Sequence, residues 1–250
     1  WARVPEPGKK RYEMSRRDEY TRQGIHGVPV DDDIAYTLLG LLIMEEYGPD
    51  FTVEDVGRAW LKLLPHACTA EEVALENLKK GLPADRAADT DNPYSEWIGG
   101  AIRADPWGYM APGWPERAAA MAYRDARISH RGEGVYGAMF FAAAVAAAFA
   151  VDDPVEAVRI GLTEIPRDCA LAGAVRWALE TAPDIRDYAR GRAAVDGRFE
   201  GMHPVHTVNN ACLTVFGVYI GRPDLRRDTG ESPARRPAIG TRRGPRGRVT

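Results

Sequence analysis

The chain has 250 residues, of which 45% are hydrophobic, and a formal net charge of −3. This length allows one substantial hydrophobic core. The charge is uneven, because residues 222–250 carry nine Arg against three acids and leave a net of about −9 for the rest. An acidic body excludes nucleic acid as its main partner.

No signal peptide and no apolar span of 18 residues is visible, so we expect no membrane association. Cys68, Cys169 and Cys212 lie far apart without CxxC spacing. This usage indicates core residues in a reducing compartment, and we expect a cytoplasmic protein. The chain begins at Trp1 rather than at a Met, which suggests that its natural start is missing.

The chain divides into three parts. Residues 1–29 are polar and contain three prolines, which predicts an irregular lead-in, and residues 30–221 form one helical domain. No segment of this domain alternates with period two, so we predict an all-α fold, a compact set of many helices. Residues 222–250 are rich in Arg, Gly and Pro and predict a disordered basic tail, which resembles the product of a shifted reading frame.

The first predicted helix, over 30–47, follows three acids, Asp31, Asp32 and Asp33. Its large apolar residues recur at threes and fours: Ile34, Leu38, Leu41, Leu42 and Met44. One Asp would cap the helix. Adjacent carboxylates about 5 Å apart repel by roughly 3 kcal/mol at an effective dielectric of 20, so three predict either a bound divalent cation or a solvated acidic cap.

Further helices follow in chain order. Thr52 and Thr69 each begin a sequence typical of a capping box and predict helices to about 64 and 80. A loop over 81–93 leads to a stretch dense in Gly, Pro and Trp, 94–115. Pro115 suits the first turn of a helix. The remaining helices are predicted over 115–130, 135–151, 154–165, 168–182, 184–195 and 205–220.

Several motifs together resemble the ADP-ribosylglycohydrolase family of all-α magnesium enzymes. A Thr-Asp-Asp-Thr motif that opens a helix is matched by residues 31–34, and a Gly-rich loop that runs into an Arg is matched by residues 99–108. A Ser-His pair before a helix of small residues is matched by Ser129 and His130, and a late helix by 206–211. The resemblance spans about residues 27–221.

The resemblance implies hydrolysis of an N- or O-glycosidic bond between ADP-ribose and a protein side chain, at a binuclear Mg²⁺ site. Asp32 and Asp33 would be catalytic and would bind the metal, with Asp31 as a further ligand in the position of the family's Thr. Substrate, either ADP-ribose or an ADP-ribosylated protein, would contact residues of the Gly-rich stretch and the Ser-His pair: Gly99, Gly100, Arg103, Trp107, Gly108 and His130.

The sequence also departs from the family. The second acidic motif, Asp-x-Asp-Thr, is missing, because Arg226 stands two residues before Asp228 and Thr229. The first helix, which contributes a Glu, is also missing. We therefore expect at most one weakly held Mg²⁺ and little activity. A silent ADP-ribose-binding domain and a helical interaction scaffold remain as alternatives.

Overall fold

The computed structural model describes residues 32–64 and 66–228, with side chains to residue 222. Within these ranges every regular element is a helix, so the all-α prediction is confirmed. The α-helices are α1 (Asp32–Tyr47), α2 (Val53–Leu63), α3 (Thr69–Lys79), α4 (Gly99–Ile102), α5 (Asp105–Tyr109), α6 (Pro115–Ala126), α7 (Gly132–Ala148), α8 (Pro154–Gly161), α9 (Ala170–Thr181), α10 (Tyr188–Arg198) and α11 (Thr207–Asp228). Short 3₁₀ turns cover Ala84–Arg86, Leu162–Glu164 and Ala182–Asp184.

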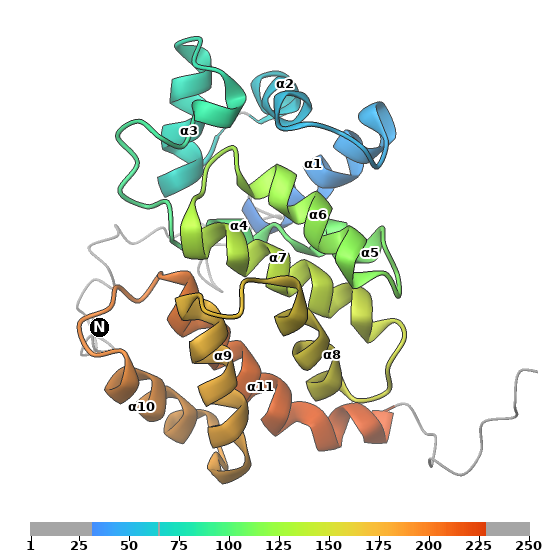
Figure 1. Cartoon of the computed structure of the whole chain (residues 1–250), viewed down its shortest axis with the longest axis vertical. Helices are drawn as coiled ribbons and strands as arrows, with labels where there is room; N and C mark the ends of the chain where they lie inside the picture. Colours follow the sequence, from blue (N-terminus) through green and yellow to red (C-terminus); the bar gives the residue numbers. More distant parts are fainter. Residues whose placement is uncertain (1–31, 65, 229–250) are drawn as a thin grey trace, which may run out of the picture.

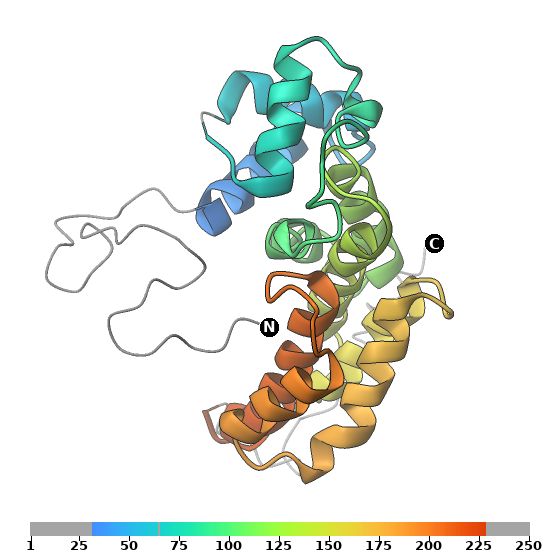
Figure 2. The same cartoon turned by 90° about the vertical axis from the view of Figure 1, so that its left-hand side faces the viewer.

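The helices lie in three groups along the long axis of the molecule. Figures 1 and 2 show α1, α2 and α3 at one end, α8 to α11 at the other, and α4 to α7 between them. One hydrophobic core joins α1 to α7 around Trp60 and Trp107, and a second joins α7 to α11 around Phe140 and Phe216. Helix α7 contributes to both cores. Among the described helices, none combines the length and the apolar character that a bilayer crossing requires.

Helix α1 has the predicted extent, but it turns a different face to the core. Its buried residues are Tyr36, Leu39, Gly40 and Ile43. The leucines that follow the predicted spacing are largely exposed, with 56% for Leu38 and 45% for Leu41. The reason is close packing: a Cβ added to Gly40 would lie 2.6 Å from Cγ of Pro106, so only a face with glycine at its centre fits against α5.

The two predicted capping boxes differ in outcome. At α2 the box is confirmed: Asp55 N–H donates to Thr52 Oγ1, and Thr52 N–H donates to a carboxylate oxygen of Asp55. At α3 the prediction is wrong. Thr69 is already the first helical residue, with a φ of 50°, and Cys68 precedes the helix without a side-chain hydrogen bond to it.

Several other helix boundaries differ from the prediction, among them both ends of α10, which spans Tyr188–Arg198 rather than 184–195. Helix α6 ends at Ala126 rather than near residue 130, because a tight turn follows in which Ser129 and His130 N–H groups both donate to Ala126 O. Helix α7 starts at Gly132 rather than at 135.

Helix α11 does not stop at Gly221 but continues to Asp228, which removes residues 222–228 from the predicted disordered tail. Gly221 does not end the helix because it lacks the positive φ that a glycine cap adopts. Arg222 stabilises this part of α11 by two contacts. Its guanidinium lies 3.6 Å from the Asp153 carboxylate and also lies over the Tyr219 ring. The lead-in, Asp31 and residues 229–250 lie outside the described residues.

Candidate functional site

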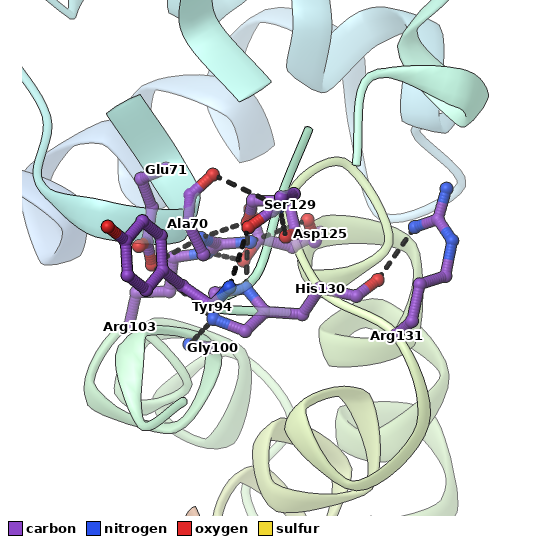
Figure 3. A network of polar contacts seen from close by, with 10 residues as sticks. Ala70, Glu71, Tyr94, Gly100, Arg103, Asp125, Ser129, His130 and Arg131 are labelled. Carbon is purple, nitrogen blue, oxygen red and sulfur yellow. Dashed lines mark hydrogen bonds and ion pairs between the residues drawn. The ribbon is translucent and has the colours of Figure 1, made fainter. Parts of the chain in front are cut away.

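A buried arginine connects four segments at the centre of the molecule (Figure 3). Arg103, which follows α4, is 2% exposed. Its Nε donates to the Asp125 carboxylate at 2.7 Å, and its Nη1 donates to Glu71 Oε1 at 2.9 Å and to Ser129 Oγ at 2.8 Å. Because removing one partner of a buried ion pair typically costs about 3–5 kcal/mol, this arginine fixes α3, α4 and the end of α6 relative to one another.

His130 extends the same network to the Gly-rich stretch. The Gly100 N–H donates to His130 Nε2 at 3.2 Å, so that nitrogen carries no proton, and Nδ1–H therefore donates to Ser129 Oγ at 2.8 Å. Burial, with help from the positive charges of Arg103 and Arg131, lowers the pKa of His130 well below its usual value. The neutral His130 therefore fixes the first turn of α4 by accepting a hydrogen bond from the Gly100 backbone amide.

Glu71 lies against the same turn from the α3 side. A Cβ added to Gly99 would lie 2.1 Å from Glu71 Oε1, so this position accepts only glycine. Burial raises the pKa of Glu71 to about 7, while the positive charge of Arg103 opposes this shift. Glu71 and His130 therefore hold the Gly99–Gly100 backbone from two sides.

The acidic start of α1 approaches the network through Asp32. The Asp32 side chain is half-buried, and its charge adds to the rise in the pKa of both Glu71 and Tyr36. Asp33, the next residue, is exposed. Since α1 also contacts Pro106 through Gly40, the helix that begins with the acidic motif packs against the 99–108 stretch; that Asp32 itself faces this stretch stays a prediction.

Two other predicted substrate-binding residues, Trp107 and Gly108, lie in the packed interior. Trp107 is 1% exposed, with its ring centroid 4.8 Å from that of Phe51. A Cβ added to Gly108 would lie 2.5 Å from Val145 Cγ1, so Gly108 allows α5 to approach α7. The side chains of Arg103 and His130 form hydrogen bonds with other groups of the protein, as described above. A substrate-binding role for these four residues stays a prediction.

The donor set at the start of α1 fits a magnesium site only in part. Within residues 32–64 and 66–228, no three His, Cys, Asp or Glu side chains lie close enough together to hold a metal ion. Mg²⁺ requires six oxygen ligands in near-octahedral geometry and usually keeps several waters. Asp32 and Asp33 diverge on the helix, and Asp31 lies outside the described residues.

Sequence reasoning missed Glu71, Asp125 and Tyr36. Glu71 stands inside a sequence typical of a capping box, a pattern that gives no sign of a buried carboxylate. Asp125 precedes the Ser-His pair by one helical turn and gives no local signal. Tyr36 did give a signal, since it follows Asp32 by four residues and so shares its helix face.

A family model described as ADP-ribosylglycohydrolase matches residues 5–224 of the chain. This match covers all the residues of the network and the acidic start of α1. No curated protein and no solved structure matches the chain.

Proposed function

Because the chain belongs to the ADP-ribosylglycohydrolase family, we propose that it hydrolyses an N- or O-glycosidic bond between ADP-ribose and a protein side chain. The observation that supports the proposal is Glu71, whose carboxylate fills the space beside Gly99 and whose raised pKa is due in small part to the charge of Asp32. The proposed ligand site lies between Asp32 and the Gly99–Gly100 turn.

Asp32 is the residue that would act on the reacting sugar. Cleavage of a glycosidic bond passes through an oxocarbenium-like centre, and a fixed carboxylate stabilises the positive charge that develops there. The Gly99 backbone would border the bound nucleotide. The N–H of Gly100 is engaged by His130, so we assign Gly100 to holding this turn rather than to binding substrate.

Magnesium binding belongs to the same proposal. Carboxylate oxygens are the ligands that Mg²⁺ prefers, and Asp32 and Asp33 supply them. Because the described residues provide an incomplete donor set, we propose at most one loosely held Mg²⁺ and low turnover.

The incomplete donor set also favours a second function, a domain that binds ADP-ribose without cleaving it. Both functions require the same ligand site and differ only in turnover. Cys68, Cys169 and Cys212 form no disulfide with one another, as is usual for cysteines in a reducing compartment, and we propose the cytoplasm as the location.

The test measures release of ADP-ribose from ADP-ribosyl-arginine and ADP-ribosyl-serine with and without Mg²⁺, together with ADP-ribose binding by calorimetry. We expect Asp32→Asn to lower turnover at least tenfold, while Asp85→Asn, which changes an acid in the loop before α4, leaves it unchanged. Binding of ADP-ribose without turnover would support the second function, a domain that binds ADP-ribose without cleaving the bond. Neither binding nor turnover would contradict both functions.

A further inference from the structure

The hydroxyl of Tyr36 is a buried polar group without a hydrogen-bond partner among the described residues. The side chain is 3% exposed and belongs to the core-facing side of α1. A buried hydroxyl left unpaired destabilises a fold, and phenylalanine would fill the same space without that penalty. The hydroxyl therefore calls for a partner that binds to the protein.

The surroundings of Tyr36 are those of the candidate site. Its ring packs on Trp60, with 6.2 Å between ring centroids, and the Arg103 guanidinium lies 5.8 Å from the Tyr36 centroid. Arg103 in turn holds Glu71. Asp32 precedes Tyr36 by one helical turn on the same face of α1. These contacts place Tyr36 between the acidic motif and the network that holds Gly99.

The charges around Tyr36 select the kind of group that fits there. Two carboxylates, Asp32 and Glu71, act on the Tyr36 side chain, and burial raises its pKa above the usual value, so the phenol is a neutral donor. A phosphate would be repelled by the Asp32 carboxylate, and the Arg103 guanidinium beside the ring is already paired with Asp125. A sugar hydroxyl fits, because it accepts a hydrogen bond from the phenol and donates one to a carboxylate.

We propose that the Tyr36 hydroxyl donates a hydrogen bond to a hydroxyl of the terminal ribose of bound ADP-ribose. The inference rests on the proposed function, in which the reacting ribose lies beside Asp32. It adds a substrate-binding residue outside the acidic motif and the Gly-rich stretch. It also explains why a tyrosine stands in the core-facing side of α1.

The experiment compares the wild type with Tyr36→Phe by calorimetric titration with ADP-ribose and with ADP, which lacks the terminal ribose. We expect Tyr36→Phe to weaken ADP-ribose binding about five- to tenfold, the effect of one hydrogen bond. Binding of ADP should not change. The Tm of the unliganded variant should equal or exceed that of the wild type, because the unpaired hydroxyl is gone.

Tyr188→Phe on α10 is the control, since Tyr188 is 68% exposed, and it should bind both ligands like the wild type. Equal affinities of wild type and Tyr36→Phe for ADP-ribose would overturn the inference while the proposed function stands. An equal loss for ADP, or a clearly lower Tm of the unliganded variant, would overturn it too. A wild-type chain that does not bind ADP-ribose would overturn the proposed function and the inference with it.

Discussion

Glu71 and His130 are buried neighbours whose ionisation is opposed by their surroundings. The Glu71 carboxylate lies 4.0 Å from His130 Nε2. Burial raises the pKa of Glu71 from 4.5 to about 7 and lowers that of His130 well below 6.5. Near neutral pH Glu71 is therefore partly protonated and His130 is neutral, so Asp125 supplies a large part of the charge that balances Arg103.

The two shifts have opposite consequences for stability. A raised carboxyl pKa in the folded state means that the Glu71 contribution is fully present below pH 4.5 and is lost as the pH rises to about 7. A lowered histidine pKa means that the His130 contribution is present above pH 6.5 and is lost as the pH falls. Between pH 4.5 and 6.5 the two effects partly cancel.

Glutamine stays neutral at every pH. We therefore predict that Glu71→Gln removes the loss of stability that Glu71 causes between pH 4.5 and 7. The free energy of unfolding of the variant, relative to wild type, should rise across this range by roughly 1–3 kcal/mol. Chemical denaturation at several pH values measures it. Glu72→Gln, at an exposed neighbouring position, is the control and should follow the wild-type profile. A constant difference between Glu71→Gln and wild type would show that Glu71 does not titrate in this window.

At the scale of elements, α2 and α3 begin with similar sequences that adopt different local structures. Both read Thr-x-Glu followed by an acid, yet only Thr52 caps its helix. At α3 the helix begins one residue earlier relative to its Thr, because Thr69 is its first residue, and Glu71 pairs with the buried Arg103. The ion pair between Glu71 and Arg103 is formed, and the predicted cap by Thr69 is not.

We predict that Thr52→Ala destabilises the fold by about 1 kcal/mol, because the Asp55 N–H loses its acceptor. Thr69→Ala should change the free energy of unfolding by less than about 0.5 kcal/mol, since no cap is lost there. Urea denaturation of both variants measures the difference. Equal losses would mean that Thr69 caps α3 in solution.

For the whole molecule, the long helices could be predicted from sequence because each combines a start signal with apolar residues at helical spacing, as at α1 and α8. Helices α4 and α5 were not predicted, since a helix of four or five residues shows no periodicity. The face of α1 was not evident either, because leucines occupy both sides and only the approach of Pro106 to Gly40 decides between them.

The candidate site was predictable in part for the same reason. Motif order indicated Asp32, the Gly-rich stretch and His130. The structure joins His130 to the Gly-rich stretch through the Gly100 N–H, whereas a site that they share with Asp32 stays a prediction. Their partners Glu71 and Asp125 are set by contacts between residues 22 to 32 positions apart, which no local pattern contains. The unpaired hydroxyl of Tyr36 becomes visible only when its surroundings are known.

The position of α7 in both cores has a consequence for hydrogen exchange. Its amides are covered on one side by α6 and on the other by α8 and α11, so no local opening exposes them without separating the two cores. We predict that the α7 amides from Ala138 to Ala146 exchange with deuterium only through global unfolding, whereas the amides of α10 exchange through smaller openings. Mass spectrometry of exchange in dilute denaturant measures both, and faster exchange in α7 than in α10 would show that the two cores open independently.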